Sequence, residues 1–518
     1  MPVENLSKIL PEEIPSGVRR ISGVATSITA FVGTAQRGPV DEPVTLASYP
    51  EFELIFGGLW AESTLGHSVR DFYRLGGSTA IIVRVHRSDS NDTASIALGP
   101  VGDTRLVLDA ASPGLWGSQL SATVDLEVSR GVDATHFNLS VTDAGTKRTE
   151  VFRDISFSSA STRPADEVLR RESSQVRVST MPTALPPAVS AGAMNGNDGL
   201  AVDDSVFTTG TDMRTNKRGV YALEDAALFN MLVIPPYTPK GDIGTQVRDD
   251  AISYAEELRA IMILDPPSGW TTPAQAMTDV GGAGFPTSEN AALYFPRIRQ
   301  PDPLKNGELS TFAPSGAVAG VISRTDAKRG VWKAPAGLEA TLSGVSELSV
   351  KVTDHDIEQL NPLGVNCLRA DPKAGHLIFG ARTRDGADQT TSEWKYLPVR
   401  RTALFLEESL DRGTRWVVFE PNSEPLWSKV RLNVGAFMNN LFRLGAFAGA
   451  KARDGYFVKC DSETTTQNDI SAGVVNIVVG FAPLKPAEFV VIRIQQKAGQ
   501  TRRAWRPRSS RARPKLGN

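Results

Sequence analysis

The sequence predicts an α/β core, a mixed sheet with flanking helices, that is built from two separate parts of the chain. Apolar, β-branched runs alternate with helical segments over residues 23–90 and again over residues 216–485. Between them, residues 91–215 hold short segments of alternating polar and apolar residues, about eight to twelve residues apart. We therefore expect a mainly-β domain inserted into one core, which a chain of 518 residues is long enough to form.

The first part of the core begins with a strand in ATSITAFVGTA, residues 25–35. Ser48 is a plausible N-cap for a short helix that stops at Gly57-Gly58. A second helix over about residues 64–75 leads into AIIVRVH, residues 80–86. The β-branched run of this segment is typical of an interior parallel strand.

The inserted domain is predicted from four alternating segments: TRLVLDAA, SATVDLEVSR, HFNLSVTDAG and TEVFRDISF. Their period of two residues is that of half-buried strands. The Pro/Gly-rich stretch PTALPPAVSAGAMNGNDG reads as a loop or linker that closes the domain.

The second part of the core opens with a strand, a helix and a strand, in LFNMLVIPP, IGTQVRDDAISYAEELR and AIMILDPP. Short connections in this order indicate a parallel βαβ unit. VRRTALFLEESLDRG predicts a helix that Gly413 ends, and TRWVVFEP, residues 414–421, predicts a buried strand.

A further helix follows, with Asn422 or Ser423 as its cap, and then two terminal strands in GVVNIVVGFAP and AEFVVIRIQ. The helix carries one apolar face at steps of four and three residues, which consists of Val430, Val434, Phe437, Leu441 and Leu444.

Cysteine content and the chain start favour a protein that is made and folded in the cytoplasm. The two cysteines, Cys367 and Cys460, exclude a disulfide framework and give no CxxC metal motif. The opening MPVENLSKILPEE lacks the basic and apolar regions of a signal peptide. Val474–Leu484 is about half the length of a membrane span.

Charge is unevenly distributed along the chain. Seven basic residues and no acid lie between Arg502 and Lys515; without them, 49 basic residues stand against 58 acidic ones. A basic tail on an acidic body could bind nucleic acid or an anionic surface. We prefer a solvated, disordered extension over residues 500–518 and expect no contact with nucleic acid.

The βαβ unit raises the possibility of a nucleotide-dependent enzyme. Such a site needs backbone N–H groups at a helix N-terminus, and Pro235 and Pro236 remove donors after the first strand of the unit. GGAGFP, residues 281–286, follows no clear strand and opens no clear helix, so we interpret it as a flexible loop. The sequence also contains no GxxxxGK[ST], GxSxG or HExxH motif.

Other candidates for chemistry are scattered. The five histidines have no ligand spacing. Asp354-His355-Asp356 is better explained as a polar helix start with Asp354 as its cap, because adjacent side chains point apart. We interpret Glu407-Glu408 as a pair that faces either solvent or another subunit. We therefore predict no catalytic residue, cofactor or metal, and no enzyme.

The two ends of the chain remain as candidate functional segments. AEFVVIRIQQ alternates with a period of two, and the first 20 residues are too interrupted by proline to form a compact unit. Terminal strands of this kind can pair with the sheet edge of another subunit. Pairing within their own chain is an equally good interpretation of the residues alone.

Several stretches together resemble the contractile tail sheath family. They are PSGVRRISGVATSITAFVGTAQRGPVDEPVTLASYPEFELIFGG, ASPGLWGSQL, APSGAVAGVISRTDAKRGVWKAPAG, LNPLGVNCLR, RRTALFLEESLDRGTRWVVFEPNSEPLW and FAPLKPAEFVVIRIQQ. Their order and spacing over residues 15–497 carry the resemblance. The inserted domain and the basic tail depart from it.

The resemblance implies a structural protein of a phage tail or a related contractile particle. Six subunits would form each ring, and rings would stack helically around an inner tube, with baseplate and terminal cap proteins as further partners. Triggering would shorten and widen the sheath and drive the tube through a membrane. The sheath itself would act on that membrane only indirectly. The inserted domain would face outward.

The resemblance also implies that terminal arms cross to neighbouring subunits. We assign residues 1–22 and 486–499 to these arms, with the strand residues Val18, Ile21, Phe489, Val491, Ile492 and Ile494. A possible tube contact consists of Lys429, Arg431 and Arg443 on the helix 424–447. A nucleotide-dependent α/β enzyme and a surface-binding β-domain protein are the alternatives.

Overall fold

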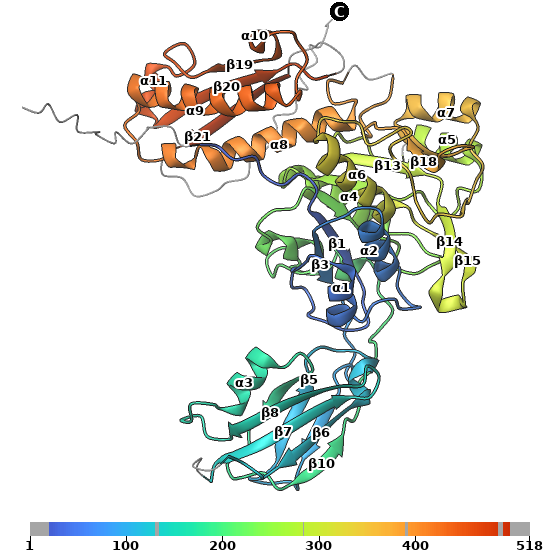
Figure 1. The fold of residues 1–518 in the computed structure, drawn as a ribbon, viewed down its shortest axis with the longest axis vertical. Helices are drawn as coiled ribbons and strands as arrows, with labels where there is room; N and C mark the ends of the chain where they lie inside the picture. The colour runs from blue at the N-terminus through green and yellow to red at the C-terminus, as the bar shows by residue number, and fades with distance from the viewer. Residues whose placement is uncertain (1–19, 130–133, 283, 389–391, 485–489, 498–518) are drawn as a thin grey trace, which may run out of the picture. The chain divides into compact units, whose positions relative to one another are not determined.

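The computed structural model describes residues 20–129, 134–282, 284–388, 392–484 and 490–497. The chain divides into two compact units: unit 1 combines Met1–Val24 with Arg401–Asn518, and unit 2 is Ala25–Arg400 (Figure 1). This division falls inside the range 216–485, which we predicted to be one part of a single core. Val18, Phe489 and the basic tail lie outside the described residues.

Unit 2 is organised around an eight-stranded sheet in the order β18-β17-β13-β12-β11-β1-β3-β2. Its six inner strands are parallel, whereas β2 and β18 run antiparallel at the edges. The mixed sheet with helices that the sequence predicts is therefore present. The strands are β1 (Thr29–Gly33), β2 (Val44–Leu46), β3 (Ala80–Arg84), β11 (Met231–Val233), β12 (Ile261–Leu264), β13 (Ala291–Phe295), β17 (Val365–Asp371) and β18 (Gly375–Phe379).

Helices cover both faces of this sheet, which explains why its inner strands consist mostly of buried apolar residues. Phe31 of β1 packs edge-on against Phe72 of α2, with 5.4 Å between ring centroids, and α6 lies beside α2. The opposite face packs against α4, α5 and α7. The helices of unit 2 core are α1 (Tyr49–Phe56), α2 (Leu65–Arg74), α4 (Thr245–Glu257), α5 (Pro273–Gly281), α6 (Ser315–Arg329) and α7 (Asp354–Leu360).

Local signals place α1 where the sequence predicts it and α7 close to its predicted start. Ser48 occupies the N-cap position of α1, and Gly57 ends the helix at φ 92°, a left-handed conformation that glycine adopts without strain. One detail differs at α7, where Thr353 is the N-cap and Asp354 the first helical residue. Thr353 and Asp356 form a reciprocal capping box there, so the cap lies one residue earlier than expected.

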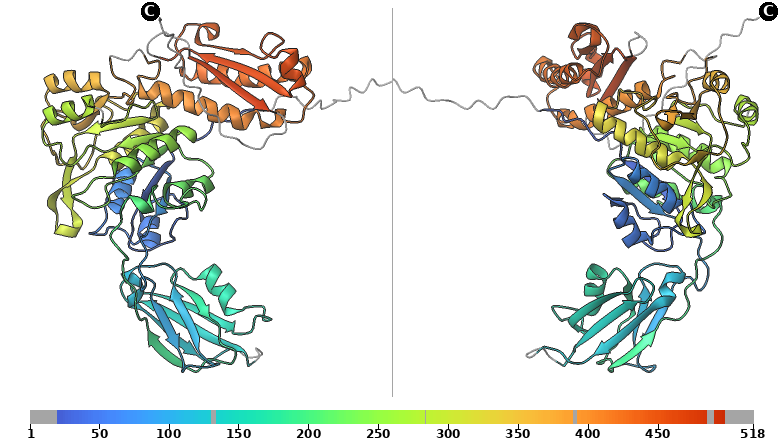
Figure 2. Two further views of the ribbon diagram at one scale, coloured as in Figure 1. Left: turned by 180° about the vertical axis from the view of Figure 1, so that it is seen from behind. Right: turned by 45° about the vertical axis from the view of Figure 1, so that its right-hand side comes forward.

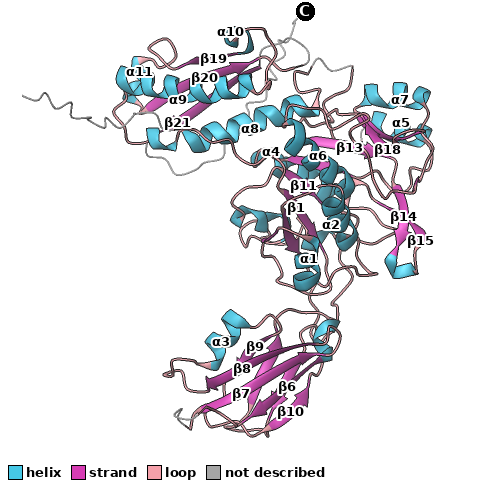
Figure 3. Cartoon of the chain, in the orientation of Figure 1, coloured by secondary structure: helices cyan, strands magenta, loops and turns pink. Residues whose placement is uncertain are grey.

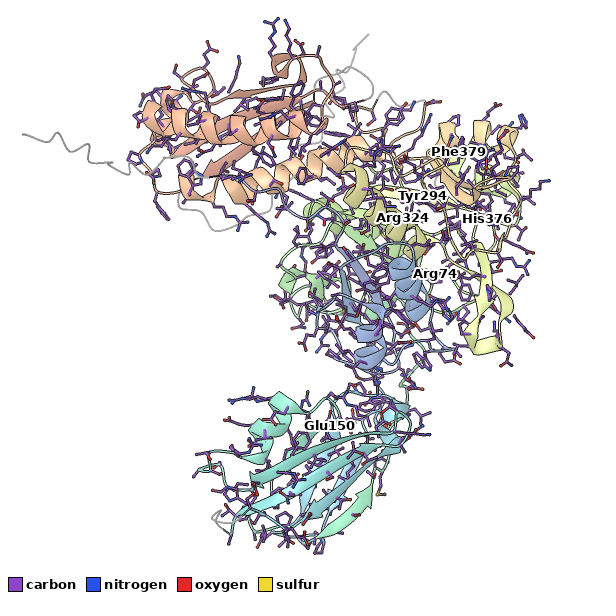
Figure 4. The ribbon with its side chains drawn as sticks, viewed as in Figure 1. Arg74, Glu150, Tyr294, Arg324, His376 and Phe379 are labelled. Carbon is purple, nitrogen blue, oxygen red and sulfur yellow. The ribbon has the colours of Figure 1, made fainter. Side chains whose placement is uncertain are left out.

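A three-stranded sheet in the order β15-β14-β16 and a strap complete the core of unit 2. The strands are β14 (Ile298–Asp302), β15 (Glu308–Phe312) and β16 (Glu347–Leu348). Residues 337–345, which we call the strap, run along the outer edge of β18; for example, Leu342 N–H donates to the His376 carbonyl at 2.7 Å. Arg324 of α6, labelled in Figure 4, also binds the strap, since its guanidinium donates to the Thr341 carbonyl at 2.7 Å.

The alternating segments of the middle region form two antiparallel sheets, β10-β6-β7-β8 and β4-β5-β9, around a common core (Figure 3). Glu150 of β8 accepts hydrogen bonds from Ser173 and Ser174 at the end of α3 (Figure 4). The elements are β4 (Ser95–Leu98), β5 (Leu106–Ala110), β6 (Leu120–Asp125), β7 (His136–Asp143), β8 (Arg148–Ser156), α3 (Ala165–Glu172), β9 (Val176–Thr180) and β10 (Val189–Gly192).

Unit 1 contains a three-stranded antiparallel sheet, β19-β20-β21, with helices α8 and α9 (Figure 2). Phe447, just after α9, and Phe481 of β20 lie 5.6 Å apart between ring centroids. The elements are α8 (Leu397–Gly413), whose first four residues belong to unit 2, α9 (Glu424–Arg443), α10 (Ala452–Gly455), β19 (Tyr456–Lys459), α11 (Gln467–Ser471), β20 (Val474–Phe481) and β21 (Val490–Lys497).

Two predictions for unit 1 are wrong. Residues 414–421 form no strand: a 3-10 turn covers Arg415–Val417, and the Val417 and Glu420 N–H groups bond to carbonyls three residues back. Leu444 does not share the apolar face of α9 and is 61% exposed. The helix ends at Arg443, and Gly445 at φ 80° turns the chain away, so the periodicity stops there. Val430, Val434, Phe437 and Leu441 are buried as predicted.

Candidate functional site: sheet edges, chain ends and helix α9

The carboxyl ends of the parallel strands are where a doubly wound sheet would hold a nucleotide. The strand order reverses between β1 and β11, and the crevice outside such a point is the usual ligand site. Here the residues before and at the start of α2 fill it. Ser63 donates to the Thr34 carbonyl at 2.7 Å, and Thr64 donates to the Pro236 carbonyl. Side chains of the protein thus donate hydrogen bonds to the two carbonyl groups that follow β1 and β11.

The glycine-rich segment GGAGFP is placed at the end of a helix. Gly281 is the last residue of α5 and Gly282 its C-cap, so the segment offers carbonyl groups where a phosphate site needs N–H donors. A shallow pocket of about 380 Å3 lies beside it. Arg248 stacks over Phe285 at 4.6 Å and donates to the Gly284 carbonyl at 3.0 Å. These polar groups already bond to one another around the pocket.

The three residues Asp354-His355-Asp356 point to different partners. Asp354 pairs with Arg369 at 2.9 Å, and Asp356 accepts from the Thr353 N–H at 2.7 Å. His355 contacts Gln359, one helical turn further on. Within the described residues, no group of three or more His, Cys, Asp or Glu side chains is arranged to hold a metal ion.

Two further sequence candidates have local roles. Glu408, which the sequence suggests as solvated or subunit-facing, bonds to Arg412 one turn along α8 at 2.6 Å and is only partly accessible. Both cysteines are buried, and burial raises the pKa of the Cys367 and Cys460 thiols to about 12. At neutral pH both therefore remain thiols, which are poor nucleophiles.

The C-terminal strand lies along an edge of the small sheet in unit 1. β21 pairs with β20 in antiparallel register over eight positions, from Val490 opposite Phe481 to Lys497 opposite Val474. Val491, Ile492 and Ile494 are thus in a strand, as predicted, and that strand is paired within its own chain. β19 pairs with the other side of β20.

The N-terminal segment meets helix α8 within unit 1. Val24 N–H donates to Ser409 at 3.1 Å, and buried Ile21 packs on Gly413. A Cβ at Gly413 would lie only 2.6 Å from Cγ2 of Ile21, so this close approach requires glycine. Ile21 lies outside any strand in the structure. Of the predicted arm 1–22, only residues 20–22 are described.

Helix α9 separates its three candidate tube-contact residues. Lys429 and Arg443 are exposed, on the face that also carries Leu432. Arg431 lies at the flank, where its guanidinium bonds to Glu424 and to the Cys460 carbonyl. The sequence gives no signal for the bond to Cys460, because the two residues lie 29 positions apart.

Two arginines that the sequence analysis does not single out have prominent structural roles. Arg84 at the end of β3 is buried and donates to the carbonyl groups of Ala35, Gly38 and Pro113. Burial lowers the pKa of Arg84 to about 10. Arg384 is likewise buried and bonds to carbonyl groups of the loops around it. For Arg84, a basic residue within the apolar run of residues 80–86 was the available sequence signal.

No helix within the described parts of the chain is both long and apolar enough to cross a membrane.

Comparison with known proteins identifies the family. Residues 217–384 match the phage tail sheath protein central domain, and residues 389–497 match the phage tail sheath C-terminal domain. The two matches together cover more than half of the chain. The tail sheath protein of Burkholderia phage BcepMu is 25% identical over 460 residues, which are 85% of this chain and 87% of that protein.

Solved structures of sheath proteins share the fold. The crystal structure of the sheath tail protein Lin1278 from Listeria innocua matches with a TM-score of 0.65 at 14% identity, covering 93% of this chain and 97% of the other. The helical sheath of the anti-feeding prophage in its contracted state matches with a TM-score of 0.57 at 20% identity, covering 96% and 100%. The chain belongs to the contractile tail sheath family.

Proposed function

We propose that this protein is the structural subunit of a contractile sheath, which polymerises with copies of itself around an inner tube. The observation that carries the proposal is the pair of sheath domains matched in order along residues 217–497. The filled crevice at the end of the parallel sheet favours this function over the nucleotide-dependent alternative. The two β sheets of the middle region alone would support only a surface-binding domain.

The proposed assembly is a stack of six-membered rings that a baseplate starts and a terminal cap completes. Contraction of the stack would drive the tube through a target membrane. The subunit would be made in the bacterial cytoplasm and become part of a phage tail or a related particle. The solved structures of the anti-feeding prophage baseplate and of its contracted helical sheath are consistent with such partners.

The terminal arms are the proposed subunit–subunit contacts. β21 is an edge strand that follows residues 485–489, and its eight-residue register with β20 can be formed equally well by β21 of a neighbouring subunit. Exchange of an identical strand keeps every main-chain hydrogen bond of the sheet and joins two chains. Residues 1–22 would form the second arm, which reaches a neighbour from the point where Ile21 packs on Gly413.

Truncation of each arm tests this proposal. We expect chains that lack residues 1–19 or residues 486–518 to remain soluble and folded, because unit 2 and the elements α8, α9, β19 and β20 of unit 1 are retained. They should form no long tubes in negative-stain electron microscopy, whereas the full chain does. Normal tubes from either truncated chain would contradict a role for that arm.

A cysteine pair distinguishes strand exchange from pairing within one chain. Asn476 and Gln495 are Cα partners in the β20–β21 register. In the double variant Asn476→Cys, Gln495→Cys, oxidation of assembled tubes should give covalent ladders on a non-reducing gel. The native cysteines are buried and serve as the background in the wild-type chain. Cross-linked monomers alone, from intact tubes, would show that β21 stays in its own subunit.

Helix α9 is the proposed tube contact. Lys429 and Arg443 present two positive charges on one exposed face, with the apolar Leu432 between them. A tube surface with acidic residues would complement this face. Arg431 is expected to contribute less, since its guanidinium is already bonded to Glu424 and Cys460.

A further inference from the structure

Phe419, in the loop before α9, is exposed in a way that the isolated subunit does not explain. Its side chain is 85% accessible to solvent, and its backbone φ is 73°. A bulky residue rarely adopts this left-handed region, because its Cβ approaches the following carbonyl. Eight other non-glycine residues of the described chain have positive φ, and all of them are Asp, Asn, Lys or Arg. Phe419 is therefore the apolar exception among the described residues.

The sequence around Phe419 conflicts with its local structure. Val417, Val418 and Phe419 are a β-branched and aromatic run that predicts a strand. The structure instead places a 3-10 turn at Arg415–Val417, and the Glu420 N–H bonds to the Val417 carbonyl at 3.2 Å. An aromatic ring in water and a strained backbone are both unfavourable. Such an outlier persists when the surrounding structure enforces it, and outliers of this kind cluster at functional positions.

Hydrogen bonds fix the loop on both sides of Phe419. On one side, Thr414 at the end of α8 donates to the Leu410 carbonyl at 2.7 Å. On the other side, Asn422 donates to the Val474 carbonyl at 3.0 Å and accepts from the Trp427 indole at 2.8 Å. The ring is thus presented by a fixed backbone, so little conformational entropy is lost when it becomes buried.

The loop lies between the two places where the chain ends enter unit 1. Gly413, which Ile21 covers, lies six residues before Phe419. Val474, which Asn422 contacts, begins β20 and pairs with Lys497 of β21. In the proposed function the N-terminal arm leaves its own subunit near Gly413, and the β21 whose Lys497 pairs with Val474 belongs to a neighbouring subunit. A surface next to them is therefore next to another copy of this chain.

We propose that Phe419 is an anchor of the contact between two copies of this chain, buried in the neighbouring subunit when the sheath assembles. This inference rests on the proposed function, because it requires polymerisation. Aromatic side chains that insert into a partner carry a large share of the binding energy of many interfaces. The fixed, outward-pointing ring of Phe419 has the properties of such an anchor.

Thiol labelling tests the burial of this position directly. The chain has two cysteines, both buried with raised pKa, so a cysteine introduced at residue 419 is the main reactive thiol. Phe419→Cys chains are mixed as a minor component with wild-type chains, so that tubes still form. We expect maleimide labelling to slow roughly tenfold or more in tubes relative to dispersed subunits. Equal labelling rates in both states would overturn the proposal.

Val101 provides a matched control, because its side chain is also 85% exposed, in the turn between β4 and β5. Val101→Cys should label at similar rates in both states. In unmixed chains, Phe419→Ala should raise the concentration needed for tube formation roughly tenfold. Phe419→Leu, which retains apolar bulk, should restore most of the assembly, and Val101→Ala should assemble like wild type.

The outcomes separate this inference from the proposed function. Wild-type chains that form no tubes contradict both. If wild-type chains form tubes, Phe419→Ala assembles normally and the labelling of Phe419→Cys is as fast in tubes as in dispersed subunits, the anchor role is contradicted. The sheath function is unaffected by that result. Circular dichroism of dispersed Phe419→Ala should match wild type, because the exposed ring adds little to the fold of the subunit. A lowered melting temperature would assign Phe419 a role in folding and would contradict the anchor.

Discussion

The two main sheets of this protein treat their edges differently. In unit 2, the strap of residues 337–345 covers the outer side of β18. The opposite edge strand, β2, is only three residues long and is preceded by Pro43. Short edge strands and proline discourage pairing with another chain. In unit 1, β20 is eight residues long, and the strand that pairs along its whole length comes from the end of the chain.

The large sheet is formed within one subunit, whereas in the proposed function another copy of the chain completes the small sheet. The strap pairs with one edge of the large sheet, a short strand forms the other edge, and helices cover both faces. The last strand of the small sheet comes from the end of the chain, and in the proposed function a neighbouring subunit supplies it. We therefore place folding stability chiefly in unit 2 and assembly chiefly in unit 1.

Core truncations in each unit are expected to have the largest effects. Phe31 of β1 and Phe481 of β20 are both fully buried. Phe31→Ala and Phe481→Ala should each cost about 3–5 kcal/mol of unfolding free energy, from lost burial and the cavity left behind. Hydrogen exchange read by mass spectrometry should show faster exchange in β1 for the first variant and in β20 for the second.

The unaffected unit serves as the control in each case. Equal acceleration in both units by a single variant would show that the two units unfold together, and the comparison between them would then be wrong.

Much of the core was predictable because its signals are local. Gly57 ends α1 where the sequence indicates, and the apolar runs around β11 and β12 do form parallel strands. The strand predicted over residues 414–421 failed because strand formation needs a partner, which residue composition does not specify. The division between Arg400 and Arg401 was also hidden, because helix α8 runs through it without a break in sequence pattern.

The candidate sites were predictable to a smaller extent. Apolar period-two alternation marks β21 as a strand, yet pairing within a chain and between chains produces the same pattern. The charge of Arg431 is visible in the sequence, whereas its bond to the Cys460 carbonyl depends on tertiary packing. For Phe419, the conflict between strand propensity and observed turn appears only when sequence and structure are compared.

A pH response should distinguish the two units, with an effect smaller than that of the core truncations. All five histidines lie in unit 2. His67 of α2 is 4% exposed, and its ring lies 4.5 Å from that of Phe312. Burial, helped by the charge of Arg70, lowers the pKa of His67 to about 4.

Since the folded pKa of His67 is lower than the unfolded value of about 6.5, folding favours the neutral ring. This contribution is fully present above pH 6.5 and is lost as the pH falls toward 4. Between pH 7 and pH 4, the unfolding free energy of wild type, measured with urea, should therefore fall by about 2–3 kcal/mol more than that of His67→Gln. The control is His355→Gln at an exposed position of α7. An identical pH dependence in wild type and His67→Gln would disprove the role of His67.

Charge reversal on α9 should have the smallest effect per residue, and it tests whether unit 1 also carries the tube contact. Lys429→Glu and Arg443→Glu each replace an attraction to an acidic tube with a repulsion, worth about 1 kcal/mol at an exposed site. Co-sedimentation of sheath with tube should weaken in both variants, and the loss should shrink at high salt because mobile ions screen exposed charges. Lys451→Glu, an exposed reversal just before α10, controls for net charge. Equal weakening by all three variants would indicate a general charge effect, and a salt-independent loss would indicate damage to the fold. Either result would exclude α9 as the tube contact. The assembly role of unit 1 would then rest on its strands alone.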